Sequence, residues 1–131
     1  MEEQLRALLL ASSGVTSLVP AARINWGEHP QGAGSPYIHM MTVSGAEGVH
    51  LKGRDGLSEF RVQVDCYSPT YPQAKQVSRA VIAALHGHRS GGLRLVSHVA
   101  TRDSREGGLT QREAERLFRV SLDFTISWRA T

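Results

Sequence analysis

The stretch that decides the fold reads FRVQVDCYSPTYPQAKQVSRAVIAAL and runs from Phe60 to Leu85. Its first half alternates apolar and polar side chains, a spacing of two that is typical of a strand with one buried face. Its second half places apolar side chains three or four positions apart, as a helix does when one face is buried. Between the halves, Ser68 or Thr70 is suited to cap the helix. The stretch therefore predicts a strand and then a helix that packs back onto the sheet.

The alternation assigns each side chain of the predicted strand to one of two faces. The apolar face carries Phe60, Val62, Val64 and Cys66, and the polar face carries Arg61, Gln63, Asp65 and Tyr67. Because Cys66 is the only cysteine, the chain cannot form an internal disulfide. Its place on the apolar face predicts a packed, inert thiol and not a catalytic nucleophile.

The composition fits one domain that spans residues 1–131. A chain of this length can bury a single core. Its 15 Lys and Arg residues outnumber its 12 Asp and Glu residues, which gives a net charge of +3, and no long run of like charges indicates a nucleic-acid-binding segment. The N-terminal MEEQLRALLLASS begins acidic and its apolar part is short, so it resembles neither a secretion signal nor a membrane span. We expect a mildly basic protein of the cytoplasm that does not contact a membrane.

Periodicity and turn residues predict the remaining elements. The expected helices are Glu2–Ser12, ended by Gly14 before an apolar connector at Val15–Val19, and Tyr71–His86. The expected strands are Arg23–Trp26, Tyr37–Val43, Phe60–Tyr67, Leu93–Ala100 and Leu117–Arg129. In the fourth of these strands, Leu93 and Leu95 lie on the same face. The last strand alternates over the longest span, so we expect it to be the longest and to lie inside the sheet. The order predicts an α+β domain in which two helices pack on one face of a mainly antiparallel, mixed sheet.

One connection in this order has a predicted handedness. If the strands Phe60–Tyr67 and Leu93–Ala100 are parallel neighbours, the helix that joins them should form a right-handed crossover.

Two polar segments interrupt this order. Ser44–Leu57 contains four glycines and fits either a mobile loop or a protruding hairpin built from Val49 to Lys52. Thr101–Arg116 contains arginines interleaved with Asp and Glu residues, so we expect a solvated or partner-binding surface loop that contacts protein more than DNA.

The residues indicate no catalytic, metal or cofactor site. The six histidines are scattered, or lie two apart at a helix end where they cannot share a face. Neither a G-x-S-x-G elbow nor a phosphate-binding or dinucleotide-binding glycine pattern is present. Asp65 and Asp123 would form a carboxylate pair if their strands were adjacent and in register. The alternatives are exposure to solvent and pairing with arginines such as Arg61 and Arg119, and we expect no enzyme.

Several parts of the sequence together resemble a known family. They are INWGEHPQG with its WG-x-x-P step at Trp26–Pro30, SPYIHMMTVSG, the strand and helix within Leu57–Val81, and the closing FRVSLDFTISW. This pattern resembles the tail terminator (tail completion) family of long-tailed phages, prophages and gene transfer agents, and the resemblance covers nearly the whole chain. It implies a homohexameric ring at the head-proximal end of a tail tube, which stops tube growth and joins the tail to the head.

The resemblance also implies the partners. They are other copies of the chain, the tail-tube protein and the head-tail connector or stopper, while DNA passes through the ring without sequence recognition. The implied location is the cytoplasm during assembly and then the head-tail junction of the particle. No catalytic motif is implied. The alternatives are a head-tail connector or stopper, a tail-tube component and a small nucleic-acid-binding module.

The two polar segments are the candidate assembly interfaces, because loops on a rigid scaffold often carry recognition. The candidate residues are Val49, His50, Leu51, Lys52, Arg54, Arg102, Arg105, Arg112 and Arg116.

Overall fold

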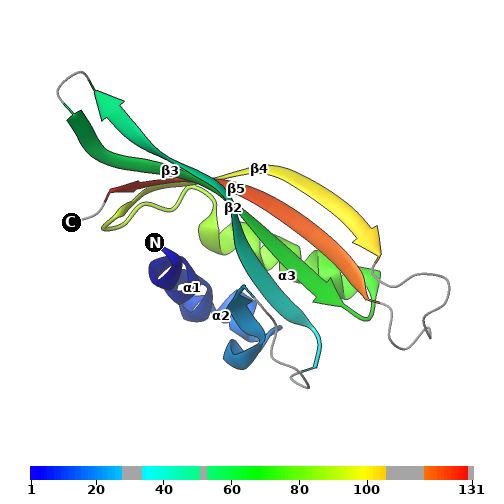
Figure 1. Cartoon of the computed structure of the whole chain (residues 1–131). Coiled ribbons are helices and arrows are strands. Elements are labelled where there is room, and N and C mark those ends of the chain that lie inside the picture. Colours follow the sequence, from blue (N-terminus) through cyan, green and yellow to red (C-terminus); the bar gives the residue numbers. More distant parts are fainter. Residues whose placement is uncertain (28–33, 51–52, 106–116, 130–131) are drawn as a thin grey trace.

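The computed structural model describes residues 1–27, 34–50, 53–105 and 117–129 (Figure 1). Its helices are α1 (Glu2–Ala11), α2 (Ser13–Thr16), the 3₁₀ turn η1 (Ala21–Arg23) and α3 (Tyr71–Leu85). Its strands are β1 (Ile24–Trp26), β2 (Tyr37–His50), β3 (Gly53–Ser68), β4 (Leu93–Arg105) and β5 (Phe118–Arg129).

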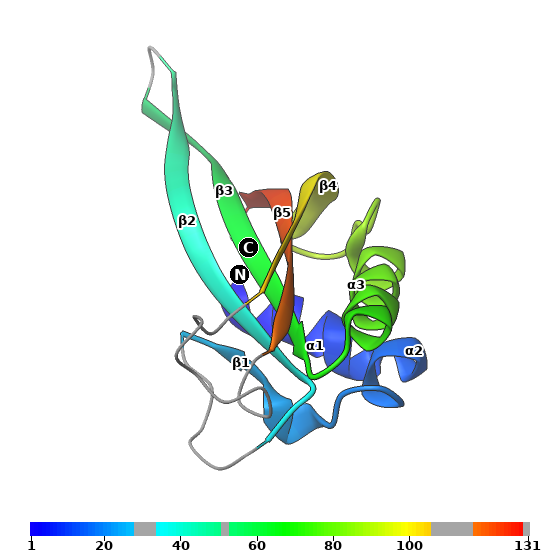
Figure 2. The same ribbon diagram turned by 90° about the vertical axis from the view of Figure 1, so that its right-hand side faces the viewer.

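The strands form one sheet in the order β1-β2-β3-β5-β4. β1 runs parallel to β2, and every other neighbouring pair is antiparallel. α3 packs against β3, β5 and β4, and α1 contacts α3 and β1, so the helices lie on one face of the sheet (Figures 1 and 2). The α+β prediction with a mainly antiparallel sheet is confirmed. β3 and β4 are not neighbours, because β5 lies between them, so the condition for the predicted crossover is not met.

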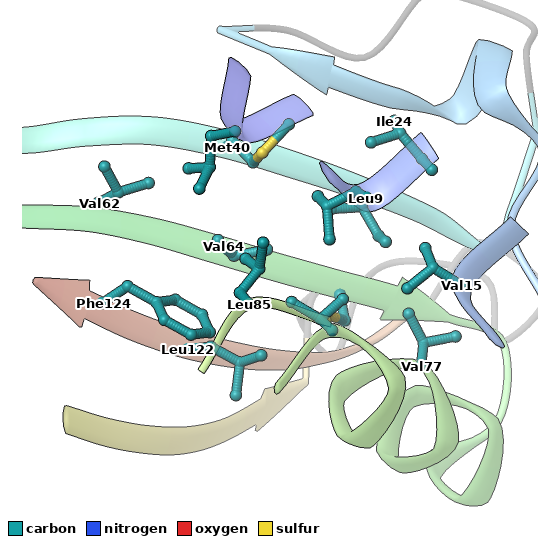
Figure 3. Close-up of a cluster of buried hydrophobic side chains, with 14 of the residues drawn as sticks. Leu9, Val15, Ile24, Met40, Val62, Val64, Val77, Leu85, Leu122 and Phe124 are labelled. Atoms are coloured by element: carbon teal, nitrogen blue, oxygen red, sulfur yellow. The ribbon is translucent and has the colours of Figure 1, made fainter. Parts of the chain in front are cut away.

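The core lies between the helices and the inner face of the sheet (Figure 3). Its fully buried side chains include Leu5, Leu9, Val15, Ile38, Met40, Val62, Val64, Cys66, Val77, Val81, Leu85, Val120, Leu122, Phe124 and Ile126. The alternation predicted for β3 is confirmed by Val62, Val64 and Cys66, whose exposed fraction is 0% in each case. The apolar stripe of α3 packs on this face, as its three-to-four-residue spacing predicts.

The N-terminal helix ends earlier than predicted. α1 stops at Ala11, and Ser12 adopts an extended conformation with φ −85° and ψ 113°. Its hydroxyl accepts a hydrogen bond from the backbone N–H of Val15 at 3.4 Å, so Ser12 caps the second short helix, α2. The prediction that Gly14 ends the first helix is therefore wrong, because Gly14 lies inside α2. The apolar stretch after it is part helix, and Val15 and Val19 both belong to the core.

The predicted strand lengths are also partly wrong. β5 lies inside the sheet as predicted, but its 12 residues are fewer than the 14 of β2, the 16 of β3 and the 13 of β4. In β4 the alternation is interrupted by irregularities between Leu93 and Leu95 and between His98 and Ala100. Each inserts an unpaired residue, so Leu93 and Val96 are buried in place of the predicted Leu93 and Leu95.

The structure decides between the two alternatives for Ser44–Leu57, a mobile loop or a protruding hairpin. Within the described residues the backbone of this segment forms a hairpin, with Val49 paired to Arg54 and His50 paired to Gly53. Leu57 is the last residue of this end of β3 that pairs with β5, so residues 48–50 and 53–56 form a ribbon of only two strands. We call this ribbon the arm, and it projects beyond the rest of the sheet (Figures 1 and 2).

Candidate assembly surfaces

The sheet face opposite the helices, here called the open face, carries a network of polar side chains. It includes Arg61, Gln63 and Asp65 of β3, Ser121 and Asp123 of β5, and Arg102 of β4. The two carboxylates are buried, with exposed fractions of 2% for Asp65 and 4% for Asp123. Buried carboxylates need hydrogen bonds or opposite charges to offset the loss of water.

Arg102 provides those contacts for Asp123. Its guanidinium donates two hydrogen bonds to the Asp123 carboxylate, one through Nη1 and one through Nη2, and Nη2 also lies 3.3 Å from Oε1 of Gln63. The hydrogen bonds from Arg102 to Asp123 raise the pKa of the guanidinium, and their charge attraction adds to this shift. Nη2 of Arg61 lies 3.6 Å from Oδ2 of Asp123. The Asp123 charge therefore faces two arginines.

Asp65 is held by a different set of groups. Nε2 of Gln63 donates to both of its oxygens, at 2.9 and 3.1 Å, and Nδ1 of His39 lies 3.8 Å from Oδ2. Oε1 of Gln63 accepts a hydrogen bond from Arg102, which also binds Asp123. Gln63 and Arg102 thus join the two carboxylates into one network. The network ties β2, β3, β5 and β4 together on the open face.

The carboxylate-pair hypothesis is corrected by the register. β3 and β5 are adjacent, but Asp65 pairs with Ser121 and Asp123 pairs with Gln63, so the two acids are not opposite one another. The alternative of arginine pairing holds for Asp123 and Arg61. Arg119 differs from that prediction, since its Nε donates to Oγ of Ser104 at 2.9 Å.

A second cluster fastens α3 to the end of β4. Asp103 accepts hydrogen bonds from Oη of Tyr71 at 2.7 Å and from Nζ of Lys75 at 2.8 Å. The Lys75 and Tyr71 hydrogen bonds lower the pKa of Asp103, and the hydrogen bond to Asp103 raises the pKa of Lys75. This cluster lies on the helix side of the sheet, and it positions the N-terminal end of α3.

The outer edge of β4 is half covered. The N–H of Gly87 donates to the carbonyl of Val96 at 2.7 Å, and the N–H of Val96 donates to the carbonyl of His88 at 3.2 Å. The N–H of His98 donates to Nδ1 of His86 at 3.0 Å. Residues 86–88 therefore occupy the edge as far as His98. Beyond it, no backbone hydrogen bond occupies the outer edge of β4 within the described part of the chain.

The edge formed by β2 is also half covered, at the opposite end. β1 pairs with β2 only from Ile38 to Met40. Past Met40, no strand pairs with the outer side of β2 among the residues that the structure describes. Three large apolar side chains lie beside the two open half-edges and are about half exposed: Met41 (43%) and Val43 (54%) on β2, and Val99 (49%) on β4. Sequence reasoning missed these residues, although MMTV, which continues past the short β1, was a possible signal.

The predicted interface residues fall into three groups. Val49 and His50 lie in β2 and Arg54 in β3, all within the arm. Arg102 and Arg105 belong to β4, so the prediction of a loop is wrong for residues 101–105, and residues 106–116 lie outside the described residues. Leu51, Lys52, Arg112 and Arg116 lie outside the described residues. The structure thus brings the first group together and places Arg102 in a contact within the chain.

The described residues offer little for other chemistry. They contain no group of three His, Cys, Asp or Glu side chains that could hold a metal ion. Across the same residues, no helix is both long and apolar enough to cross a membrane. An open hollow of about 390 Å³ lies where the arm leaves the sheet, lined by residues that include Ser44, Arg61 and Thr125. It is a surface depression of the open face.

Comparisons with known proteins show the family through a sequence model and the fold through a solved structure. Residues 3–128 match the family model described as tail completion protein gp17. Among solved structures, a chain from the "Virion of native gene transfer agent (GTA) particle" is similar, with a TM-score of 0.68 and 18% sequence identity. The similarity covers 96% of this chain and 92% of that chain. No curated protein sequence matches the chain.

Proposed function

Because the chain belongs to the tail completion protein gp17 family and is thus a structural protein of phage-type tails, we propose that it is the tail terminator. In this role, copies of the chain form a ring, most simply a homohexamer, at the head-proximal end of the tail tube. The ring stops tube growth and presents the finished tail to the head-tail connector. The observation that carries the proposal is the family match, which extends over residues 3–128 and so includes the sheet, the helices and the arm.

The shape of the subunit supports a protein that acts through assembly. Among the described residues, helices cover one face of the sheet, and the open face and one half of each sheet edge carry no further element. An isolated two-stranded ribbon such as the arm is marginally stable in water, so a partner would stabilise it. Cyclic symmetry would repeat each such contact at every interface of a ring.

The partners follow from this role. They are other copies of the chain, the tail-tube protein on one side and the connector or stopper on the other, with DNA passing through the ring. Assembly takes place in the cytoplasm, and the protein then stays at the head-tail junction. The contact surfaces are the arm, with Val49, His50 and Arg54, and the arginine-rich segment that follows Arg102. Arg105 is the better probe of that segment, because Arg102 already binds Asp123.

Deleting the gene in a strain that produces the particle tests the proposal. We expect tail tubes of uncontrolled length and free heads in electron micrographs, and expression of the wild-type chain from a plasmid should restore joined particles of normal length. Tails of normal length that fail to join heads would contradict termination and favour a stopper. Purified protein should also bind to the ends of isolated tubes and not along their walls.

A further inference from the structure

We propose that neighbouring copies in the ring join head to tail by antiparallel strand pairing, between the open half of β2 in one copy and the open half of β4 in the next. This inference rests on the proposed ring and specifies its contact. The occupant of each half-edge is a second copy of this chain. Unpaired edge strands present rows of backbone N–H and C=O groups that accept another strand.

The strand directions fit such a contact. β2, β3, β5 and β4 alternate in direction, since each neighbouring pair is antiparallel. β2 and β4 therefore run in opposite directions at the two sides of the sheet. When the next copy keeps the same orientation around the ring, its β2 meets β4 in the antiparallel sense, which continues the hydrogen-bonding pattern of the sheet. The two surfaces are different, as a head-to-tail ring requires.

The coverage of the two edges excludes a level alignment of neighbouring copies. The register places Met40, Val64, Leu122 and Thr101 at one level of the sheet. β1 thus covers β2 at the level where β4 is open, and residues 86–88 cover β4 at the level where β2 is open. In a level alignment the open half of each edge would meet the covered half of its neighbour.

β1 is held firmly in this blocking position. Nε of Arg6 donates to the carbonyl of Ile24 at 2.7 Å, and Nε1 of Trp26 donates to the carbonyl of Glu2 at 3.0 Å. Ile24 is also fully buried in the core. The pairing of open halves therefore requires neighbouring copies to be shifted along the strands, while β1 stays in place.

The required shift agrees with the geometry of closed sheets. Matching residues 99–105 with the part of β2 past Met40 takes a shift of about six residues, or roughly 20 Å at 3.3 Å per residue. One subunit contributes four strand spacings, or roughly 19 Å. The strands would then incline by about 45° to the ring axis, at the upper end of the range of closed barrels. The same pairing would cover the half-exposed Met41, Val43 and Val99.

Cysteine cross-linking tests the shifted pairing in the Cys66→Ala background. In the double variant Ser44→Cys and Ser104→Cys, the thiol at position 44 of one copy lies close to the thiol at position 104 of the next copy only in the shifted alignment. Ser44→Cys with Ser97→Cys is the matched control, because the register leads from Ser44 through Arg61 and Thr125 to Ser97 at the same level. The side chains at 44, 97 and 104 all belong to the open face by this register.

A short bismaleimide should link the first pair into a ladder of oligomers up to the full ring and leave the second pair uncross-linked. The readouts are denaturing electrophoresis and native mass spectrometry. Cross-linking of the control pair would overturn the shifted pairing. If native mass spectrometry shows a ring and neither pair is cross-linked, the shifted pairing is also overturned. The deletion phenotype tests termination separately, so a terminator with a different subunit contact would be recognised.

A second variant tests the edges without cysteines. Val43→Glu and Val99→Glu place a charge beside each open half-edge, where no core packing is lost because both side chains are about half exposed. We expect monomeric proteins with an unchanged circular dichroism spectrum. Ala83→Glu is the control, because Ala83 is also exposed but lies on α3, outside both edge strands. Rings of normal size from both valine variants would contradict the proposal.

Discussion

Cys66 lies on the inner face of β3 and is fully buried. Burial raises the pKa of its thiol, with a further contribution from the nearby Asp65 charge, so the reactive thiolate is scarce in the folded protein. Cys66→Ala should lower the free energy of unfolding by about 1 kcal/mol, because a small core group is lost. Denaturant unfolding measures this change. Rapid labelling of the native thiol would show that the buried assignment is wrong.

Arg102 should matter more to stability than an exposed arginine usually does. Arg102→Ala leaves the buried Asp123 without its two-bond partner, and only Arg61 remains nearby, at 3.6 Å. We expect a lower free energy of unfolding, because removing one partner leaves a buried charge with fewer compensating contacts. Arg94→Ala, at an exposed position on the same strand, is the matched control and should change little. If the two variants have equal free energies of unfolding, solvent and Arg61 suffice to compensate the Asp123 charge without Arg102.

Asp103 predicts a small dependence of stability on pH. Its pKa is lowered by hydrogen bonds from Lys75 and Tyr71, so its contribution is present above the unfolded pKa and is lost as pH falls through the folded value. The carboxylate is exposed, so the effect should be modest. Asp103→Asn should lower the free energy of unfolding at pH 7 and make less difference near pH 3. A difference that grows on acidification would contradict this assignment.

Among the elements, the turn before β4 depends on a close approach that only glycine permits. A Cβ on Gly92 would lie 2.5 Å from two ring carbons of Trp128 and 2.9 Å from the carbonyl oxygen of Arg129. The carbonyl of Gly92 also accepts a hydrogen bond from the N–H of Arg129 at 2.9 Å, which holds the turn against β5. Gly92→Ala should therefore lower the free energy of unfolding by roughly 1–3 kcal/mol.

Gly14→Ala is the control for that substitution. Gly14 lies within α2, and the only atom near a new Cβ is Oγ of Ser12, at 3.7 Å. Alanine favours a helix over glycine by up to about 1 kcal/mol, so this variant should be neutral or more stable. Thermal unfolding of both proteins measures the contrast. If Gly92→Ala melts at the same temperature as the wild-type protein, the turn can open without cost.

Local patterns predicted most of the elements but not where two of them end. The helix at Tyr71 was predicted to within one residue, because Thr70 caps it through the N–H of Gln73 and its apolar stripe is regular. Gly87 and Gly91, which follow this helix, have φ of 79° and 52°, in the left-handed region that glycine tolerates. For the extended parts of β2 and β3, the sequence does not decide between a loop and a hairpin, because glycines interrupt the alternation that marks a strand.

At the scale of the whole molecule, the arm should affect assembly and not folding. Deleting residues 47–55 joins Ala46 to Gly56 and leaves the pairing of Ala46 with Glu59 in place. Next to the deletion, β3 stays paired with β2 and with β5, and β5 stays paired with β4. The far-ultraviolet spectrum of the monomer should therefore be nearly unchanged. The mutant particles should have tails of uncontrolled length or tails that fail to meet heads, as seen by electron microscopy.

Normal particles from this deletion would remove the arm from the mechanism. Amide exchange gives an independent check: the described arm residues should be protected in the ring and exchange fast in the monomer. Fast exchange throughout the arm in the assembled ring would count equally against its role.

By itself, the sequence determined the strand and helix between Phe60 and Leu85, the inward side of β3, the place of β5 inside the sheet, and the resemblance to tail completion proteins. These features depend on spacing along the chain, which any reader of the sequence can count. Only the tertiary structure decided that β5 lies between β3 and β4, that Arg102 binds Asp123, and that the open halves of the two sheet edges lie at opposite ends. Each of these joins residues far apart in the chain, and the strand order and register that bring them together leave no local pattern in the sequence.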